Sequence, residues 1–121
     1  MKKILLVEDD KLFVRIYKNS LKKAGFETTF LENGEKAVPE AKKVKPDLIM
    51  LDLVMPKKDG FETLADLKAD PVTKNIPVFV LSALESEADV EKIRNLGAKK
   101  YIFKSTNSLK VVIDEVKSFL Q

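Results

Sequence analysis

The chain of 121 residues contains no cysteine, no histidine and no tryptophan, and it has only four glycines and five prolines. Without cysteine the chain has no disulfide, no thiolate nucleophile and no cysteine metal ligand. Without histidine it has no imidazole base and no imidazole ligand. Any step through a phosphohistidine must therefore take place on a partner.

The chain also lacks long apolar runs and segments of biased composition. No run approaches the roughly 20 residues that a membrane helix needs, and the lysine-rich start leads into a strand pattern, not a signal peptide. No glycine-rich phosphate loop follows the first apolar run, which argues against nucleotide binding. With 45% hydrophobic and 34% charged residues, the sequence predicts one domain over residues 1–121, located in the cytoplasm and not bound to a membrane.

Apolar runs alternate with helical patterns along the whole chain, without an internal repeat. The expected strands are Lys3–Val7, Phe26–Leu31, Asp47–Asp52, Val78–Ser82 and Lys100–Phe103. The expected helices are Lys11–Ala24, Glu35–Val44, Phe61–Ala69, Ser86–Leu96 and Ser108–Leu120. The first, third and fourth strands are continuously apolar, as in a parallel sheet covered on both faces, whereas the second alternates like an edge strand. The pattern predicts an α/β fold, a doubly wound three-layer sandwich.

Four single residues indicate where helices begin and end. Asp10 is expected to cap the first helix, and Gly25 and Gly97 fall where helix C-terminal caps are expected. Pro39 lies inside the second helical pattern, where its ring clashes one turn back. The sequence therefore predicts a kink or a late start of this helix.

Polar residues follow four of the expected strands. Glu8 and Asp9 end the first, Asp52 the third and Ser82 the fourth, and Lys104 follows the fifth. In open parallel sheets the functional crevice lies beyond the carboxyl ends of the strands. Clustered carboxylates require a cation, and oxygen ligands of this kind suit Mg²⁺, which completes its octahedron with water and phosphate. The pattern predicts phosphoryl transfer, with Asp52 as nucleophile, Lys104 as a point charge and Ser82 as a hydrogen-bond donor.

Each of these residues also has an ordinary structural interpretation. Asp52 alone could be a strand-end turn residue, the acids after the first strand could merely cap a helix, and Lys104 alone would be a surface lysine. Tyr101 is as well explained as a half-buried aromatic. Only the joint placement of these groups at strand ends predicts a site.

Four segments, ILLVEDD, LIMLDLVMPKKDG, VFVLSA and YIFKS, resemble the receiver domain of two-component response regulators in their order and spacing. The resemblance covers the whole chain. It implies a (βα)5 flavodoxin-like sandwich with the strand order 2-1-3-4-5, an order taken over from the family. It also implies that Asp52 accepts a phosphoryl group from a histidine kinase or a histidine phosphotransfer protein.

The same resemblance assigns roles to the other residues. Asp9 would bind Mg²⁺ directly and Glu8 through water, with Asp52 and the backbone carbonyl of Val54 as further ligands. Ser82 takes the place of the family's switch hydroxyl, Tyr101 that of its aromatic switch and Lys104 that of its invariant lysine. The apolar side chains of Val54 and Leu84 cannot orient water, so slow loss of phosphate is expected.

Ser105 departs from the family pattern, in which a proline usually follows the lysine, often after a cis peptide bond. A non-proline cis bond costs about 2.5 to 4 kcal/mol, against about 0.5 to 1 before proline. We therefore expect a trans bond between Lys104 and Ser105. This change puts the reach of Lys104 toward Asp52 in question.

Two helices carry candidate partner surfaces. Counting about 100° per residue places two sets of residues on opposite sides of the first helix: a basic set, Lys11, Arg15, Lys18 and Lys22, and a largely apolar set, Leu12, Phe13, Ile16, Ser20 and Ala24. The basic set is either a solvated face or a docking surface for an acidic region of the kinase. On the last helix the expected buried stripe is Leu109, Val112, Ile113, Val116 and Leu120. Val111 remains outside it, on the face that receivers use for targets or for a phosphorylation-dependent homodimer.

Several functions remain open from the sequence. The leading one is a stand-alone switch that acts by binding an unknown downstream protein and catalyses only its own Mg²⁺-dependent phosphorylation and dephosphorylation; the chain could equally be a receiver excised from a longer regulator. Direct nucleic-acid binding is not expected, because a net charge of +3 comes without a recognition motif. A phosphatase resembling the haloacid dehalogenase family would need an Asp where Val54 stands. A phosphorylation-independent pseudo-receiver scaffold would normally lack the acids or the lysine.

Overall fold

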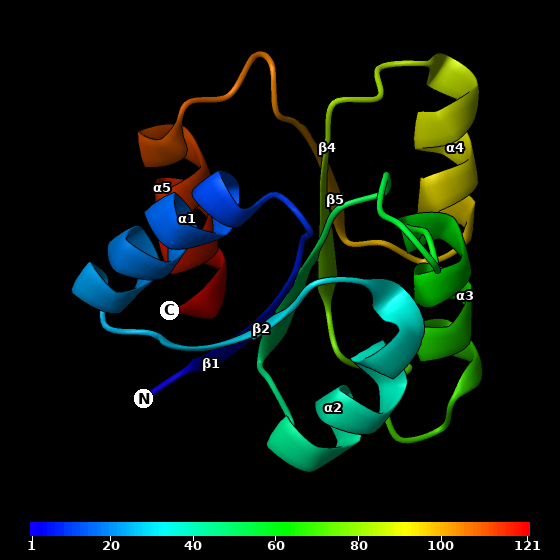
Figure 1. The fold of residues 1–121 in the computed structure, drawn as a ribbon, viewed down its shortest axis with the longest axis horizontal. Coiled ribbons are helices and arrows are strands. Elements are labelled where there is room, and N and C mark those ends of the chain that lie inside the picture. Colours follow the sequence, from blue (N-terminus) through cyan, green and yellow to red (C-terminus); the bar gives the residue numbers. More distant parts are fainter.

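The fold follows the expected alternation of strands and helices (Figure 1). The computed structural model describes residues 1–121. Its strands are β1 (Lys3–Val7), β2 (Glu27–Leu31), β3 (Leu48–Leu51), β4 (Val78–Ser82) and β5 (Lys100–Phe103). Its helices are α1 (Lys11–Lys23), α2 (Ala37–Val44), α3 (Gly60–Ala69), α4 (Glu87–Asn95) and α5 (Leu109–Leu120), with a short 3-10 turn, η1 (Gly34–Lys36), before α2. Every predicted strand and helix is present.

All five strands are parallel and lie in the order β2-β1-β3-β4-β5, which confirms the expected doubly wound sheet. Helices α1 and α5 cover one face, and α2, α3 and α4 cover the other (Figure 1). The residues of β3 and β4 are buried on both faces, whereas β2 at the edge is only partly covered, as its alternating pattern predicted. This topology brings the carboxyl ends of β1, β3, β4 and β5 to one edge of the sheet.

The helix ends form where their end residues predicted. The Asp10 carboxylate caps α1 by accepting hydrogen bonds from the backbone N–H groups of Leu12 at 3.0 Å and Phe13 at 3.2 Å. Gly25 and Gly97 follow their helices with φ angles of +92° and +104°, a region that glycine enters without strain. Pro39 is the third residue of α2, where its missing N–H costs no helical hydrogen bond. The predicted late start of this helix is therefore confirmed.

The buried face of α1 differs from the prediction. Leu12 and Ile16, expected on the apolar side, are 63% and 41% exposed. The side chains that face the core are instead centred on Tyr17 and Leu21, with Phe13 beside them. Leu12 and Ile16 lie roughly 100° or more around the helix from Tyr17, so they cannot reach the sheet. The face of α1 that points outward is therefore both basic and apolar.

Helix α5 packs as predicted. Val112 and Val116 are buried, and they are flanked by the partly buried side chains of Leu109, Ile113 and Leu120. Val111 is exposed on the other side. None of the helices combines the length and the apolar content that a membrane span requires.

Candidate functional site

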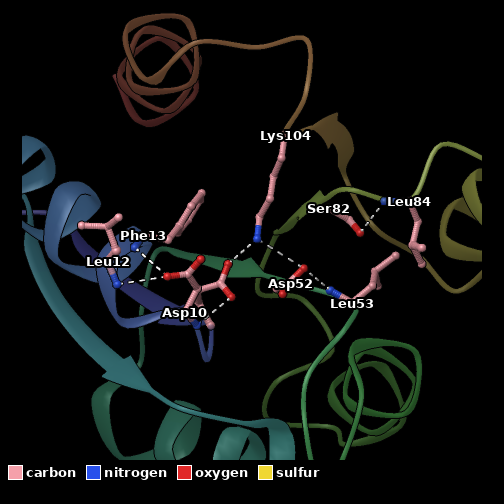
Figure 2. A network of polar contacts seen from close by, with 9 residues as sticks. Asp10, Leu12, Phe13, Asp52, Leu53, Ser82, Leu84 and Lys104 are labelled. Carbon is pink, nitrogen blue, oxygen red and sulfur yellow. Dashed lines mark hydrogen bonds and ion pairs between the residues drawn. The ribbon is translucent and has the colours of Figure 1, made fainter.

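The predicted site residues lie at the carboxyl edge of the sheet, and Figure 2 shows Asp52, Ser82 and Lys104 together there. Asp52 follows β3 directly, and its backbone N–H donates to the carbonyl of Val7 at the end of β1, at 3.0 Å. The backbone N–H of Lys104, directly after β5, donates to the carbonyl of Ser82 at the end of β4, at 2.9 Å. Continuous backbone pairing therefore fixes all four strand ends relative to one another.

Three carboxylates converge at this edge. One oxygen each from Glu8, Asp9 and Asp52 lies within 4.8 Å of the others. Glu8 and Asp52 are only 3% and 5% exposed, whereas Asp9 is open to solvent. Such a set of oxygen donors, buried on one side and accessible on the other, fits a hard divalent cation that keeps several waters, such as Mg²⁺. Val54 lies on the same loop as Asp52, with its side chain exposed.

The charge of the pocket also favours a cation. The pKa of Glu8 is raised to about 7, mainly by burial and in smaller part by the neighbouring Asp52 charge. The hydrogen bond from Lys104 lowers this pKa but does not offset the burial. A divalent cation would relieve this unfavourable burial of negative charge and would compete with a proton for Glu8.

Lys104 reaches across the pocket from the opposite side. Its Nζ lies 2.5 Å from Glu8 Oε1 and 3.6 Å from Asp52 Oδ1. The chain contains no cis peptide bond, so the expected trans bond between Lys104 and Ser105 is confirmed. The missing proline therefore does not keep the lysine away from Asp52.

Asp52 is oriented by its own loop. Its Oδ1 accepts a hydrogen bond from the backbone N–H of Leu53 at 2.8 Å, and the carbonyl of Leu53 accepts one from Gly60 N–H at 2.9 Å. A Cβ atom at position 60 would lie 2.2 Å from the Asp52 carbonyl oxygen, so only glycine allows α3 to begin this close to the site. The sequence prediction gave Gly60 no role of its own, although it ends the LIMLDLVMPKKDG segment.

Ser82 and Tyr101, the two predicted switch residues, meet at the backbone of Leu84. The buried Ser82 Oγ accepts a hydrogen bond from Leu84 N–H at 3.1 Å, and the Tyr101 hydroxyl donates to the Leu84 carbonyl at 2.7 Å. Burial raises the pKa of Tyr101, so the hydroxyl remains a donor at neutral pH. The loop that leads from β4 to α4 is thus held on both sides by these two side chains.

The basic residues of α1 lie outside the pocket. Their side chains are exposed along the helix, and the set consists of Lys11, Arg15, Lys18 and Lys22. Helix α1 starts directly after the acidic cluster (Figure 1). The row of cations on it therefore begins beside the pocket. Exposed Leu12 and Ile16 add apolar area to the same outer side of the helix.

Comparison with known proteins agrees with this geometry. Residues 4–115 match the family model of the response regulator receiver domain. The polar-differentiation response regulator DivK of Brucella anthropi is 34% identical over 119 residues, which cover 98% of this chain and 96% of that protein. The chain therefore belongs to the receiver domain family of response regulators, the CheY-like signalling switches of two-component systems.

Two solved structures resemble the chain over nearly its whole length. The Mn²⁺-bound form of the response regulator Rcp1 is 38% identical, with a TM-score of 0.81 over 98% of this chain and 91% of that one. The phosphorylated cyanobacterial phytochrome response regulator RcpA is 39% identical, with a TM-score of 0.81 over 98% and 90% of the two chains. Receiver domains of this kind are switches in signalling and not classical enzymes.

Proposed function

We propose that the chain is a phosphorylation-dependent switch in which Asp52 accepts a phosphoryl group from a histidine kinase or a histidine phosphotransfer protein. The observation that carries the proposal is the convergence of three carboxylates with Lys104, whose Nζ lies 3.6 Å from Asp52 Oδ1. Asp9, Asp52 and the Val54 carbonyl would hold Mg²⁺, with Glu8 acting through water. The similar structures of Mn²⁺-bound Rcp1 and of phosphorylated RcpA support the same chemistry here.

In the proposed transfer an Asp52 carboxylate oxygen attacks the phosphorus of phosphohistidine, and the bond from phosphorus to the imidazole nitrogen breaks. The imidazole leaves on the partner, because this chain has no histidine. A bound cation would neutralise charge on the phosphoryl oxygens. Lys104 is close enough to add its charge to the same oxygens, and Ser82 Oγ would donate a hydrogen bond to them.

The switch itself would act through the loop after β4. The Ser82 hydroxyl now accepts a hydrogen bond from Leu84 N–H, and turning toward a phosphoryl group would break this bond. The Tyr101 hydroxyl holds the carbonyl of the same Leu84, so its ring would follow the loop. The expected result is a changed protein-binding face over α4, β5 and α5, read by an unknown downstream protein or by a second copy at Val111. Neither a membrane nor a nucleic acid is needed for this output, and the site of action would be the cytoplasm.

Exposure to a small phosphodonor tests the proposal. Incubation with Mg²⁺ and acetyl phosphate should add the mass of one phosphoryl group, and the same sample with EDTA should stay unmodified. An unmodified protein that also releases no inorganic phosphate would favour a phosphorylation-independent scaffold. An unmodified protein that releases phosphate steadily would indicate turnover, as in a phosphatase with an aspartyl-phosphate intermediate. Such phosphatases of the haloacid dehalogenase type need an Asp where Val54 stands.

The basic row on α1 is expected to dock the kinase or phosphotransfer protein. Reversing charge with Arg15→Glu and Lys18→Glu should slow phosphoryl transfer from that partner by about tenfold at low salt, because complementary charge mainly accelerates association. The rate with acetyl phosphate should not change. Lys43→Glu with Lys74→Glu is the matched control, because both residues are exposed and lie outside α1. An equal loss with both phosphodonors would contradict docking on α1.

The phosphorylated protein is expected to lose its phosphate slowly. Val54 is exposed and apolar and Leu84 is half-buried, so neither side chain can orient an attacking water. Val54→Asn combined with Leu84→Glu should accelerate decay by about tenfold, since these side chains supply hydrogen-bonding groups at the same places. The decay is measured by intact mass after the phosphodonor is removed. Unchanged decay in the double variant would count against this explanation.

A further inference from the structure

In this chain no proline follows Lys104, so the position of the lysine side chain must be fixed by other contacts. Ser105 follows the lysine. The loop backbone is held in other ways, because Lys104 N–H donates to the Ser82 carbonyl at 2.9 Å and Asn107 Nδ2 donates to the Phe103 carbonyl at 2.9 Å. The Ser105 hydroxyl also donates to the Glu85 carboxylate. These bonds fix where the side chain begins but not where its ammonium group ends.

The ammonium group lies over an aromatic ring of α1. Lys104 Nζ is 4.3 Å from the centroid of the Phe13 ring, well inside the range of a cation–π contact. Figure 2 shows this ring beside the end of the lysine side chain, on the side of α1. The lysine side chain remains 22% exposed, so water competes for its ammonium group wherever the ring and the carboxylates do not hold it.

The Phe13 ring is itself held in place. It stacks on Tyr17 with a centroid separation of 4.2 Å and an angle of 14° between the planes. Tyr17 lies one helical turn later and is only 5% exposed, so packing in the core fixes the Tyr17 ring on which Phe13 stacks. The Asp10 cap fixes the start of the same helix through the N–H of Phe13. A rigid aromatic surface therefore meets a long and flexible cationic side chain.

We propose that Phe13 is a positioning residue for Lys104, which keeps the ammonium group within reach of Asp52 in a loop without the proline. The proposal rests on the phosphorylation function proposed above. In this role Phe13 acts on the reaction through the lysine. The Phe13 ring contacts the ammonium group from the side of α1, while the carboxylates of Glu8 and Asp52 attract the same group.

A set of kinetic variants tests the role. Phe13→Leu keeps an apolar side chain but removes the ring, and it should slow phosphorylation by acetyl phosphate about three- to tenfold. Phe13→Tyr keeps the ring and should retain the rate. In a Lys104→Met background the rate is low and is followed over hours, and there Phe13→Leu should have no further effect. An equal slowing in both backgrounds would overturn the proposal, because the ring would then act through the fold and not through the lysine.

A second measurement does not depend on phosphorylation. Protons on the ε carbon of Lys104 should show an upfield ring-current shift in the NMR spectrum, and Lys104→Met identifies the signal by its loss. Phe13→Leu should return this signal to the position of an ordinary lysine. If Phe13→Leu lowers the melting temperature too far for use, Phe13→Met takes its place.

The two measurements separate the proposal from the function on which it rests. An upfield-shifted signal in a protein that acetyl phosphate does not modify would refute the proposed phosphorylation and leave the contact intact. A signal at the ordinary lysine position in the unaltered protein would overturn the positioning role, whether or not Asp52 is phosphorylated.

Discussion

Asp52→Asn is expected to abolish the gain of a phosphoryl group from acetyl phosphate and Mg²⁺. The carboxamide has almost the shape of the carboxylate, but it is a poor nucleophile and carries no charge to share with a cation. Asp52 is buried at the centre of the site, and no other carboxylate within reach has the same contact with the loop before α3. Intact mass after an hour of exposure should show only the unmodified protein.

Asp114→Asn is the matched control, since this exposed residue of α5 is not one of the three converging carboxylates. It should gain the same mass as the unaltered protein. A phosphoryl group that still appears on the Asp52→Asn variant would assign the nucleophile to another acid, with Asp9 the first to be tested. The Asp52→Asn substitution should also lower the pKa of Glu8, because it removes the Asp52 charge that raises this pKa.

The sheet and the site were predictable from the sequence for the same reason. Strands buried on both faces must be continuously apolar, so the polar residue that ends each run marks the carboxyl edge. Asp52 and Ser82 follow this rule, whereas Lys104 follows β5, an edge strand that is only partly buried. The strand order was not contained in any single segment and came from the resemblance to receivers.

The outer side of α1 could not be predicted from periodicity alone. Leu12 and Ile16 fit one apolar stripe and Tyr17 and Leu21 fit another, and the sheet accepts only the second. The contact that decides between them joins α1 to strands distant in the chain. Periodicity placed Phe13 on the apolar side of the helix together with Leu12 and Ile16. Its contact with Lys104 depends on the packing of α1 beside the end of β5, which the sequence pattern does not show.

The shortest ion pair of Lys104 also could not be predicted from the sequence. The sequence predicted a lysine near Asp52, but Nζ lies closer to Glu8, at 2.5 Å against 3.6 Å, across 96 residues of chain. The sequence does not distinguish the two carboxylates, because both lie at the carboxyl edge of the sheet. Burial makes the consequence large, since the same Glu8 carries the raised pKa.

Glu8→Gln is expected to stabilise the protein in the absence of metal and to weaken its response to Mg²⁺. The pKa of Glu8 is raised from 4.5 to about 7 by burial, so between these pH values the folded state binds more protons than the unfolded state. Stability without metal should therefore be fully present below about pH 4.5 and fall as pH rises through about 7. Glutamine has no such proton to lose, so the variant should be more stable at pH 8 by about 1–3 kcal/mol and nearly equal at pH 4.5.

Urea unfolding in EDTA at the two pH values measures this difference, and Glu91→Gln on the exposed side of α4 is the control. Addition of Mg²⁺ at pH 8 should reverse the order. The unaltered protein gains stability in proportion to its affinity for the cation, whereas the variant has lost one of the pocket's three converging carboxylates. A variant that is no more stable than the unaltered protein at pH 8 in EDTA would show that Lys104 fully offsets the buried charge. The expected result instead makes Glu8 a residue that lowers stability so that the pocket can bind a cation, which is the exchange found at sites built for function and not for the fold.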